Sequence, residues 1–190
     1  MSKDGIKTTL SLTIICVMAA LLLGIVNSVT APVIATRAEA DRAEKRQEVM
    51  AEADSFEPIE NIENYDKTGM VQAGYIAMSG GEAIGYVFDV VNNSGFGGPM
   101  AVTVGVTNEL KFSGLRMGDN SETAGLGSRA AEPAFYEQFA DKSGDPVLTV
   151  NASGENNIDG LTSATITSTA VTEAAQSAWN TAQAIQGEVA

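Results

Sequence analysis

The chain carries a long uncharged apolar run close to its N-terminus. No Asp, Glu, Lys or Arg occurs from Thr8 to Thr36, and Leu, Ile, Val and Ala predominate. This run is longer than the roughly 20 residues that an α-helix needs to cross a bilayer. It is also longer than the roughly 7–15-residue apolar region of a signal peptide, although Ala38-Glu-Ala40 offers a small-residue cleavage pattern. We therefore expect residues 1–36 to form a short cytoplasmic start and a retained transmembrane anchor.

The composition changes after the anchor. Residues 37–55 are rich in Ala, Glu and Arg, strong helix formers of mixed charge that predict a solvated helical stalk. Pro32 is placed to kink the helix near the membrane surface. Residues 56–190 remain for one domain of ordinary size.

Charge and residue usage exclude several classes of function. A net charge of −13 argues against nucleic acid, because neutralising phosphates requires clustered Lys and Arg. The chain has no His, which removes His-based acid–base catalysis and the commonest metal ligand. Its single cysteine, Cys16, lies in the anchor, so disulfides and cysteine-held iron–sulfur clusters are excluded within this chain. We expect neither a metal site nor a complete active site.

Residues 71–118 have the pattern of β-structure. The apolar segments 71–78 and 83–91 flank Ser79-Gly80-Gly81, and the segments 101–106 and 110–116 flank Thr107-Asn-Glu109. Both arrangements predict β-hairpins. Half-buried strands are also indicated by the alternation of apolar residues at 86, 88, 102 and 104.

Two helices are predicted after these strands, a short one over 132–139 and a long one over 163–186. Because the strands are grouped and the helices lie elsewhere, the fold class is α+β, an antiparallel sheet with a long C-terminal helix. The long helix carries an apolar stripe at helical spacing. Its members are Ile166, Ala170, Val171, Ala174, Ala178, Trp179, Ala182 and Ile185.

A cluster of hydroxyl groups precedes the long helix, in the sequence Asp-Gly-Leu-Thr-Ser-Ala-Thr-Ile-Thr-Ser at 159–168. Ser and Thr oxygens at a helix start accept hydrogen bonds from the free N–H groups of the first turn. The same N–H groups, with the positive end of the helix dipole, also suit a phosphate. The residues alone leave a capped helix and a phosphate site as alternatives.

Two glycine-rich segments, 92–99 and 121–127, follow predicted strands. Glycine permits tight turns with positive φ, and it also allows the backbone to approach a ligand closely. We interpret 92–99 as a loop between two strands and leave both explanations of its glycines open.

The order of residues in the hydroxyl cluster resembles a known motif. Asp159-x-x-Thr162-Ser163-Ala164-Thr165 is similar to the attachment motif of the FMN-binding domain family. The resemblance implies that Thr165 carries FMN through a phosphoester bond, which a separate flavin transferase installs from FAD. It also implies that Asp159 helps the transferase to recognise or orient the motif. The family usually has Gly where this chain has Ser163, whose hydroxyl is a competing acceptor.

The two glycine-rich segments resemble the same family. Glu-Thr-Ala-Gly-Leu-Gly at 122–127 is similar to a family loop, and Phe-Gly-Gly-Pro at 96–99 is similar to a family turn. The resemblance implies that both lie near the isoalloxazine ring of FMN, with Leu126 as an apolar contact and Thr123 as a polar one. The further cofactor-binding residues that it implies are Thr162, Ser163, Ala164, Glu122, Gly127 and Gly97.

Together with the anchor, these motifs resemble the G subunits of Rnf electron-transport complexes. The resemblance implies an electron carrier with no complete active site of its own. It would work among partner subunits of a membrane complex that passes electrons between ferredoxin and NAD and moves Na⁺ or H⁺. The alternatives are the C subunit of the sodium-pumping NADH:quinone oxidoreductase, a flavin domain of another system, and a non-redox anchored β-rich interaction module.

The orientation in the cytoplasmic membrane is not decided by the flanking charges. Lys3 and Lys7 favour a cytoplasmic N-terminus, whereas four basic residues between 37 and 46 on the other side oppose it under the positive-inside rule. The family resemblance implies that the chain crosses once and that the flavin domain lies on the outer face.

Overall fold

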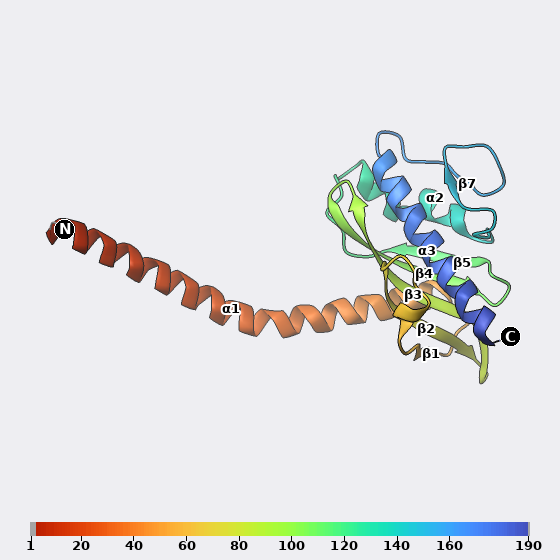
Figure 1. Ribbon diagram of the computed structural model, residues 1–190, viewed down its shortest axis with the longest axis horizontal. Coiled ribbons are helices and arrows are strands. Elements are labelled where there is room, and N and C mark those ends of the chain that lie inside the picture. Colours follow the sequence, from red (N-terminus) through yellow and green to blue (C-terminus); the bar gives the residue numbers. More distant parts are fainter. Residues whose placement is uncertain (1–2, 190) are drawn as a thin grey trace. The chain divides into compact units, whose positions relative to one another are not determined.

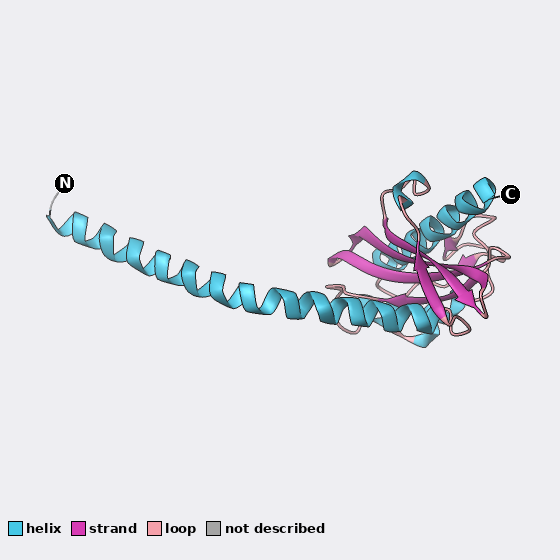
Figure 2. Ribbon diagram, turned by 90° about the horizontal axis from the view of Figure 1, so that it is seen from below, coloured by secondary structure: helices cyan, strands magenta, loops and turns pink. Residues whose placement is uncertain are grey.

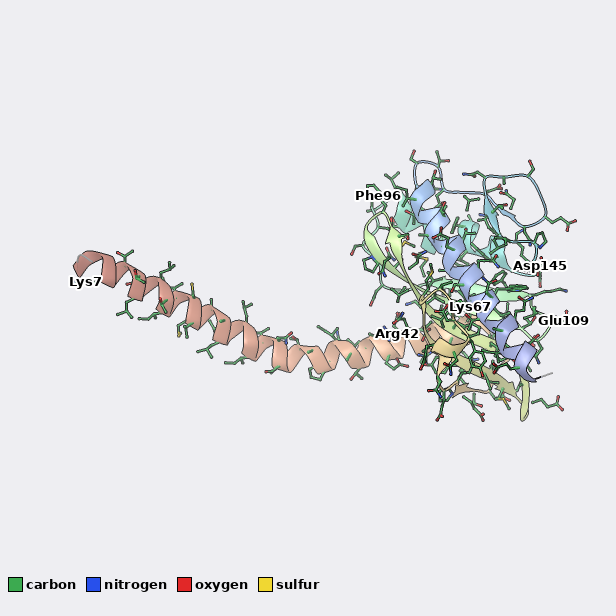
Figure 3. The ribbon with its side chains drawn as sticks, viewed as in Figure 1. Lys7, Arg42, Lys67, Phe96, Glu109 and Asp145 are labelled. Atoms are coloured by element: carbon green, nitrogen blue, oxygen red, sulfur yellow. The ribbon has the colours of Figure 1, made fainter. Side chains whose placement is uncertain are left out.

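A computed structural model describes residues 3–189 and divides into two compact units, with the division between Asp41 and Arg42. The first unit is the main part of helix α1 (Lys3–Val49). Its large apolar side chains, from Leu10 to Ile34, are all about half exposed or more, and they project from the helix in Figure 3. Within the described residues this is one helix long and apolar enough to cross a membrane, with a mean hydropathy of 2.6. It is consistent with the single-pass anchor predicted above.

The second unit is built on a five-stranded antiparallel sheet with the strand order β1-β2-β3-β4-β5. Both predicted hairpins are confirmed. In the first, Ser79 pairs with Glu82, and the intervening Gly80 and Gly81 have φ of +59° and +86°, which a two-residue hairpin turn requires. The strands are β1 (Ser55–Pro58), β2 (Val71–Ser79), β3 (Glu82–Gly95), β4 (Gly98–Thr107) and β5 (Phe112–Met117).

The prediction of a loop over 92–99 is wrong. Strands β3 and β4 run into this segment until Gly95 pairs with Gly98, so only Phe96 and Gly97 form the turn. Glycine at 95 allows β3 to continue to the turn, because a Cβ at this position would overlap the side chain of Met100. Asn92 is buried here, and its amide donates to the carbonyl of Ala170 at 2.9 Å, which ties β3 to the C-terminal helix.

The long C-terminal helix is confirmed as α3 (Thr165–Val189), which crosses one face of the sheet (Figure 1). Its apolar stripe packs on inward-facing strand residues such as Phe88 and Val104 to form the main core. Trp179 is buried and donates from Nε1 to the carbonyl of Leu110 at 2.7 Å. The stripe prediction is wrong at Ile166, which is 54% exposed because the first turn of α3 extends beyond the packed core.

The opposite face of the sheet receives the last turns of α1, which belong to the second unit (Figure 2). Val49 and Met50 pack there with Val87, whose side chain points away from that of its neighbour Phe88. Val49 lies against Gly105, and a Cβ at position 105 would come within 2.8 Å of the carbonyl oxygen of Val49. The predicted boundaries at 1–36, 37–55 and 56–190 stay a prediction.

The connection from β5 to α3 is made of short elements. The predicted helix over 132–139 is confirmed as α2 (Pro133–Tyr136), followed directly by a 3-10 helix (Glu137–Phe139). Another 3-10 helix (Gly127–Ala131) precedes it, and a further one (Ile62–Asn64) lies before β2. Strands β6 (Thr149–Val150) and β7 (Asn157–Ile158) form a small parallel pair that the sequence did not predict.

Candidate functional site

A pocket of about 310 Å³ opens where three distant segments meet at one end of the second unit. These segments are the turn between β3 and β4, the loop 121–127, and the start of α3. In Figure 1 the tip of the β3–β4 hairpin and the first turn of α3 lie at the same end of the domain. The pocket is lined by Phe96, Glu122, Thr123, Leu126, Gly127, Ser163, Ala164, Thr165, Ile166 and Thr167.

The first turn of α3 presents backbone N–H groups to this pocket. Ala164 N–H donates to Leu161 and Ser168 N–H donates to Ala164, but in the described part of the chain no acceptor is found for the N–H groups of Thr165, Ile166 and Thr167. Of the two alternatives left by the sequence, the capped helix is therefore not found among the described residues. Three N–H donors at the positive end of a helix suit an anion, and phosphate is the usual one.

Hydrogen bonding separates the five hydroxyls of the cluster. Ser168 is buried, accepts from the N–H of Leu161 at 2.9 Å and donates to the carbonyl of Ala164. Thr167 is also buried and donates to Glu122 at 2.7 Å. Thr162 is exposed but lies outside the pocket. Of the five, only Ser163 and Thr165 offer exposed hydroxyls within the pocket, with no side-chain hydrogen bond among the described residues.

Ser163 has a backbone conformation that favours glycine. Its φ is +64°, in the left-handed region, which costs a non-glycine residue roughly 1–2 kcal/mol. The family motif usually has Gly here, so the structure gives a physical reason for that preference. The turn places the next residues, Ala164 and Thr165, at the start of α3.

One side of the pocket is apolar. Phe96 is 67% exposed, Ile166 54% and Leu126 41%. In the part of the second unit that the structure describes, Val147 is the only other exposed large apolar side chain. In Figure 3 Phe96 lies at the hairpin tip beside the first turn of α3. Exposed apolar side chains gathered around one pocket indicate a ligand or partner surface.

The carboxylate of Glu122 joins the three segments. Its Oε1 accepts from the N–H of Gly97 at 3.0 Å, and its Oε2 accepts from the hydroxyl of Thr167 at 2.7 Å. A Cβ at Gly127 would overlap the same carboxylate, and a Cβ at Gly97 would overlap the carbonyl of Ser121. Both glycines therefore permit close approach between the segments.

Two predicted site residues lie in an adjacent polar depression of about 320 Å³. Asp159 and Thr162 line it together with Arg129 and Gln138. The side-chain amide of Gln138 both accepts from the N–H of Asp159 at 2.7 Å and donates to its carbonyl at 3.2 Å. The carboxylate of Asp159 accepts from Asn157 at 2.9 Å. These contacts fix the loop that leads to Ser163.

The structure thus brings together seven of the residues predicted for the site, and places Gly97 one hydrogen bond away from them. It does not bring Asp159 and Thr162 into the same pocket. Sequence reasoning missed Ile166, which was assigned to the core stripe, and Thr167, which was treated only as part of the hydroxyl cluster. The seven that line the pocket are Thr165, Ser163, Ala164, Glu122, Thr123, Leu126 and Gly127.

Comparison with known proteins assigns the chain to a family. The FMN-binding domain family matches residues 95–180, a range that contains every residue lining the pocket. The chain is 33% identical over 182 residues to the G subunit of the Na⁺-translocating ferredoxin:NAD⁺ oxidoreductase complex of Acetobacterium woodii. That match covers 90% of this chain and 87% of the relative. The chain belongs to the G-subunit family of ion-translocating oxidoreductase complexes.

Other members of the G-subunit family support this assignment. The G subunit of the proton-translocating ferredoxin:NAD⁺ oxidoreductase complex of Clostridium ljungdahlii is 30% identical, with 90% of this chain and 87% of the relative covered. The G subunit of the ion-translocating oxidoreductase complex of Methanosarcina acetivorans is 30% identical, with 98% of both chains covered. The resemblance to Rnf G subunits is confirmed.

Solved structures share the fold of this G-family chain. The C subunit of the Na⁺-translocating NADH-quinone reductase of Parabacteroides distasonis has a TM-score of 0.55 at 16% identity, over 74% of this chain and 90% of that one. NqrC of Shewanella oneidensis has a TM-score of 0.51 at 14% identity, over 73% of this chain and 74% of that one. At these identities the likeness shows the fold alone.

Proposed function

We propose that this chain is the electron-carrying G subunit of an ion-translocating ferredoxin:NAD⁺ oxidoreductase and that it holds FMN covalently through Thr165. The observation that carries the proposal is the pocket at the start of α3, where the exposed Thr165 lies beside N–H groups that have no acceptor among the residues the structure describes. The G-subunit relatives support membership of the complex, because their names specify ferredoxin:NAD⁺ oxidoreductases.

The residues present fit the parts of FMN. A phosphate linked to Thr165 would be held by the N–H groups of Thr165, Ile166 and Thr167 and by the dipole of α3. The flat ring would rest on the apolar side chains of Phe96, Leu126 and Ile166, and the exposed hydroxyl of Thr123 would serve a polar edge.

Thr165 is favoured as the acceptor by elimination within the hydroxyl cluster. Thr167 and Ser168 are buried and already hydrogen-bonded, and Thr162 lies outside the pocket. Ser163 also lines the pocket, but it lies in the turn before the helix with a left-handed backbone conformation. Thr165 is the first residue of α3. Asp159, in its polar depression, is left accessible to the flavin transferase that would install the cofactor.

The flavin supplies the electron-transfer chemistry, and the protein supplies position and environment. Glu122 is the only charged residue that lines the pocket among the described residues. The apolar side chains exclude water from one side of the bound ring, and the covalent bond keeps the cofactor in place. The remaining redox centres and the ion path belong to partner subunits of the complex.

The flavin domain is proposed to lie on the outer face of the cytoplasmic membrane, held by α1. Ser55 is exposed at the start of β1 and provides a labelling position in the domain. A Ser55→Cys substitution in a Cys16→Ala background should react with a membrane-impermeant thiol reagent in intact cells. Labelling only after lysis would place the domain inside and would refute the proposed orientation.

The proposed electron transfer is tested in membranes that contain the assembled complex. Thr165→Val keeps the shape of the side chain and removes its oxygen, so the complex should assemble but lose ferredoxin:NAD⁺ oxidoreductase activity. Ser163→Ala removes the other available hydroxyl of the cluster and should retain activity. Full activity in Thr165→Val membranes would show that the electron path does not depend on Thr165.

The C-subunit alternative has weaker support. The solved C subunits share the fold at 14–16% identity, whereas the G subunits match at 30–33% identity over 90% or more of this chain. A purified yellow protein would exclude the non-redox interaction module.

A further inference from the structure

We propose that Glu122 is a positioning residue that holds the turn of the β3–β4 hairpin against the start of α3, and so keeps Phe96 over the cofactor pocket. This inference rests on the proposed function for the identity of the cofactor, but its structural part concerns only residues of this chain. Glu122 lies in the loop after β5, and neither of the segments that it joins is near it in the sequence.

The first support is the pair of hydrogen bonds made by one carboxylate. Oε1 accepts from the N–H of Gly97 at 3.0 Å and Oε2 accepts from the hydroxyl of Thr167 at 2.7 Å. Hydrogen bonds to an ionised acceptor are stronger than those between neutral groups. Thr167 is 1% exposed, so the α3 end of this bridge is rigid. The hairpin end is an exposed turn, which makes it the part that the bridge restrains.

The second support is that the turn has few other restraints. Phe96 is 67% exposed, and Gly97 and Pro99 are exposed as well. The ladder between β3 and β4 shifts register between Asn92 and the pair Gly95–Gly98, so regular pairing ends before the tip. A hairpin tip of this kind opens readily on its own. The bond from Gly97 to Glu122 is therefore the contact best placed to hold Phe96 beside Ile166.

The third support is the space reserved for the carboxylate. A Cβ at Gly127 would overlap Glu122 Oε2 and would lie 2.7 Å from Thr167 Oγ1. The backbone of the loop is thus folded back on its own glutamate, and only glycine at 127 allows it. This close packing fixes the position of the carboxylate between the β3–β4 turn and the start of α3.

The same bridge also withdraws a hydroxyl from the reactive cluster. Thr167 is buried, and its hydroxyl is already engaged because it donates to Glu122. Glu122 therefore removes one competing hydroxyl from the choice of acceptor.

The structural part is tested in the full-length chain without flavin, prepared in a Thr165→Val background in detergent. Hydrogen exchange of the Gly97 amide is followed by NMR. Glu122→Ala should accelerate this exchange about tenfold or more, because a charge-assisted hydrogen bond is lost, and amides in the body of β3 and β4 should not change. Glu122→Asp keeps the charge but is too short to reach both partners, so it should resemble Glu122→Ala.

The matched control is Glu137→Ala. Glu137 is exposed, and its side chain makes no hydrogen bond or ion pair within the described residues, so removing its charge should leave the Gly97 amide unchanged. Glu122→Gln retains one acceptor oxygen and should give an intermediate exchange rate. Unchanged exchange of Gly97 in Glu122→Ala would overturn the inference, whatever the flavin content of the wild-type chain.

The functional part is tested in the flavin-loaded chain by acrylamide quenching of flavin fluorescence. Glu122→Ala and Phe96→Ala should both raise the quenching constant, whereas Glu137→Ala should not. Faster exchange at Gly97 without increased quenching would show that the turn does not cover the cofactor. A wild-type chain that carries no flavin would refute the proposed function and would leave the Gly97 result standing.

Discussion

The buried ion pair between Arg46 and Asp89 is predicted to fix the end of α1 on the sheet. Arg46 is 6% exposed and Asp89 is 9% exposed, and Arg46 Nη2 lies 2.9 Å from Asp89 Oδ2. The guanidinium also lies 4.0 Å from the centre of the Tyr75 ring, and Thr103 donates to the second carboxylate oxygen. Removing one partner of a buried pair leaves the other charge uncompensated and costs about 3–5 kcal/mol.

Asp89→Ala should therefore lower the free energy of unfolding by about 3–5 kcal/mol. The control is Glu48→Ala, which removes the partner of Arg116 in the same helix end. That pair is 2.6 Å long, but its side chains are 27% and 48% exposed, so its loss should cost less than about 1 kcal/mol. The double variant Arg46→Met/Asp89→Leu replaces both charges by apolar groups and should be more stable than Asp89→Ala.

The assay is urea unfolding of the detergent-solubilised chain, followed by tryptophan fluorescence. Trp179 is the only tryptophan of the sequence, and it is a residue of α3 buried in the main core, so its emission reports unfolding of the second unit. If Asp89→Ala loses no more stability than Glu48→Ala, the ion pair does not hold the helix end and the reasoning from burial is refuted.

Three further predictions concern the pocket and the fold around it. Ser163→Gly relieves the left-handed strain at φ +64°, so the melting temperature should rise by about 2–4 °C for a gain of about 1 kcal/mol; a fall would contradict this assignment of strain. Leu126→Ala should leave flavin content unchanged but shift the flavin spectrum or redox potential, and an unaltered spectrum and potential would place the ring elsewhere. Burial raises the pKa of Asp66, but hydrogen bonds from Thr68, Val71 and Ser177 outweigh it and hold that pKa below its ordinary value of 3.8. The stabilisation is therefore present above pH 3.8 and is lost as the pH falls through the folded pKa. Below about pH 4 the wild-type chain should lose unfolding free energy more steeply than Asp66→Asn, and parallel pH profiles would contradict this.

Local patterns were sufficient to predict most of the fold. Alternating apolar residues and the Gly80–Gly81 turn predicted the first hairpin, because strand period and turn chemistry are properties of neighbouring residues. The end of β3 was missed because Gly95 resembles a loop residue until Met100 is known to fill its space. Ile166 was placed in the core because helical spacing gives a face but does not say where the packed surface of the sheet ends.

Most residues of the candidate site were predicted, but the hydrogen bonds that join them were not. The motif and the loop at 122–127 were identified together by family resemblance, and the structure brings residues 163–165 of the motif and four residues of the loop to one pocket, whereas Asp159 and Thr162 line the adjacent depression. The bridge from Glu122 to Gly97 and Thr167 was not predictable, because it joins residues distant in the sequence through side-chain geometry. The absence of a hydroxyl cap on α3 was likewise missed, because the sequence does not show which residue begins the helix: α3 starts at Thr165, and Ala164 before it has no side-chain oxygen to act as a cap.

The central claim is that Thr165 carries FMN, and an intact mass spectrum of the purified chain, followed by fragmentation of its peptides, tests it most directly. The chain should have the added mass of one FMN, located on the peptide that contains Thr165, and Thr165→Val should lack it while remaining folded. An unmodified wild-type chain from cells with the flavin transferase, or FMN found on Ser163 instead, would contradict the account.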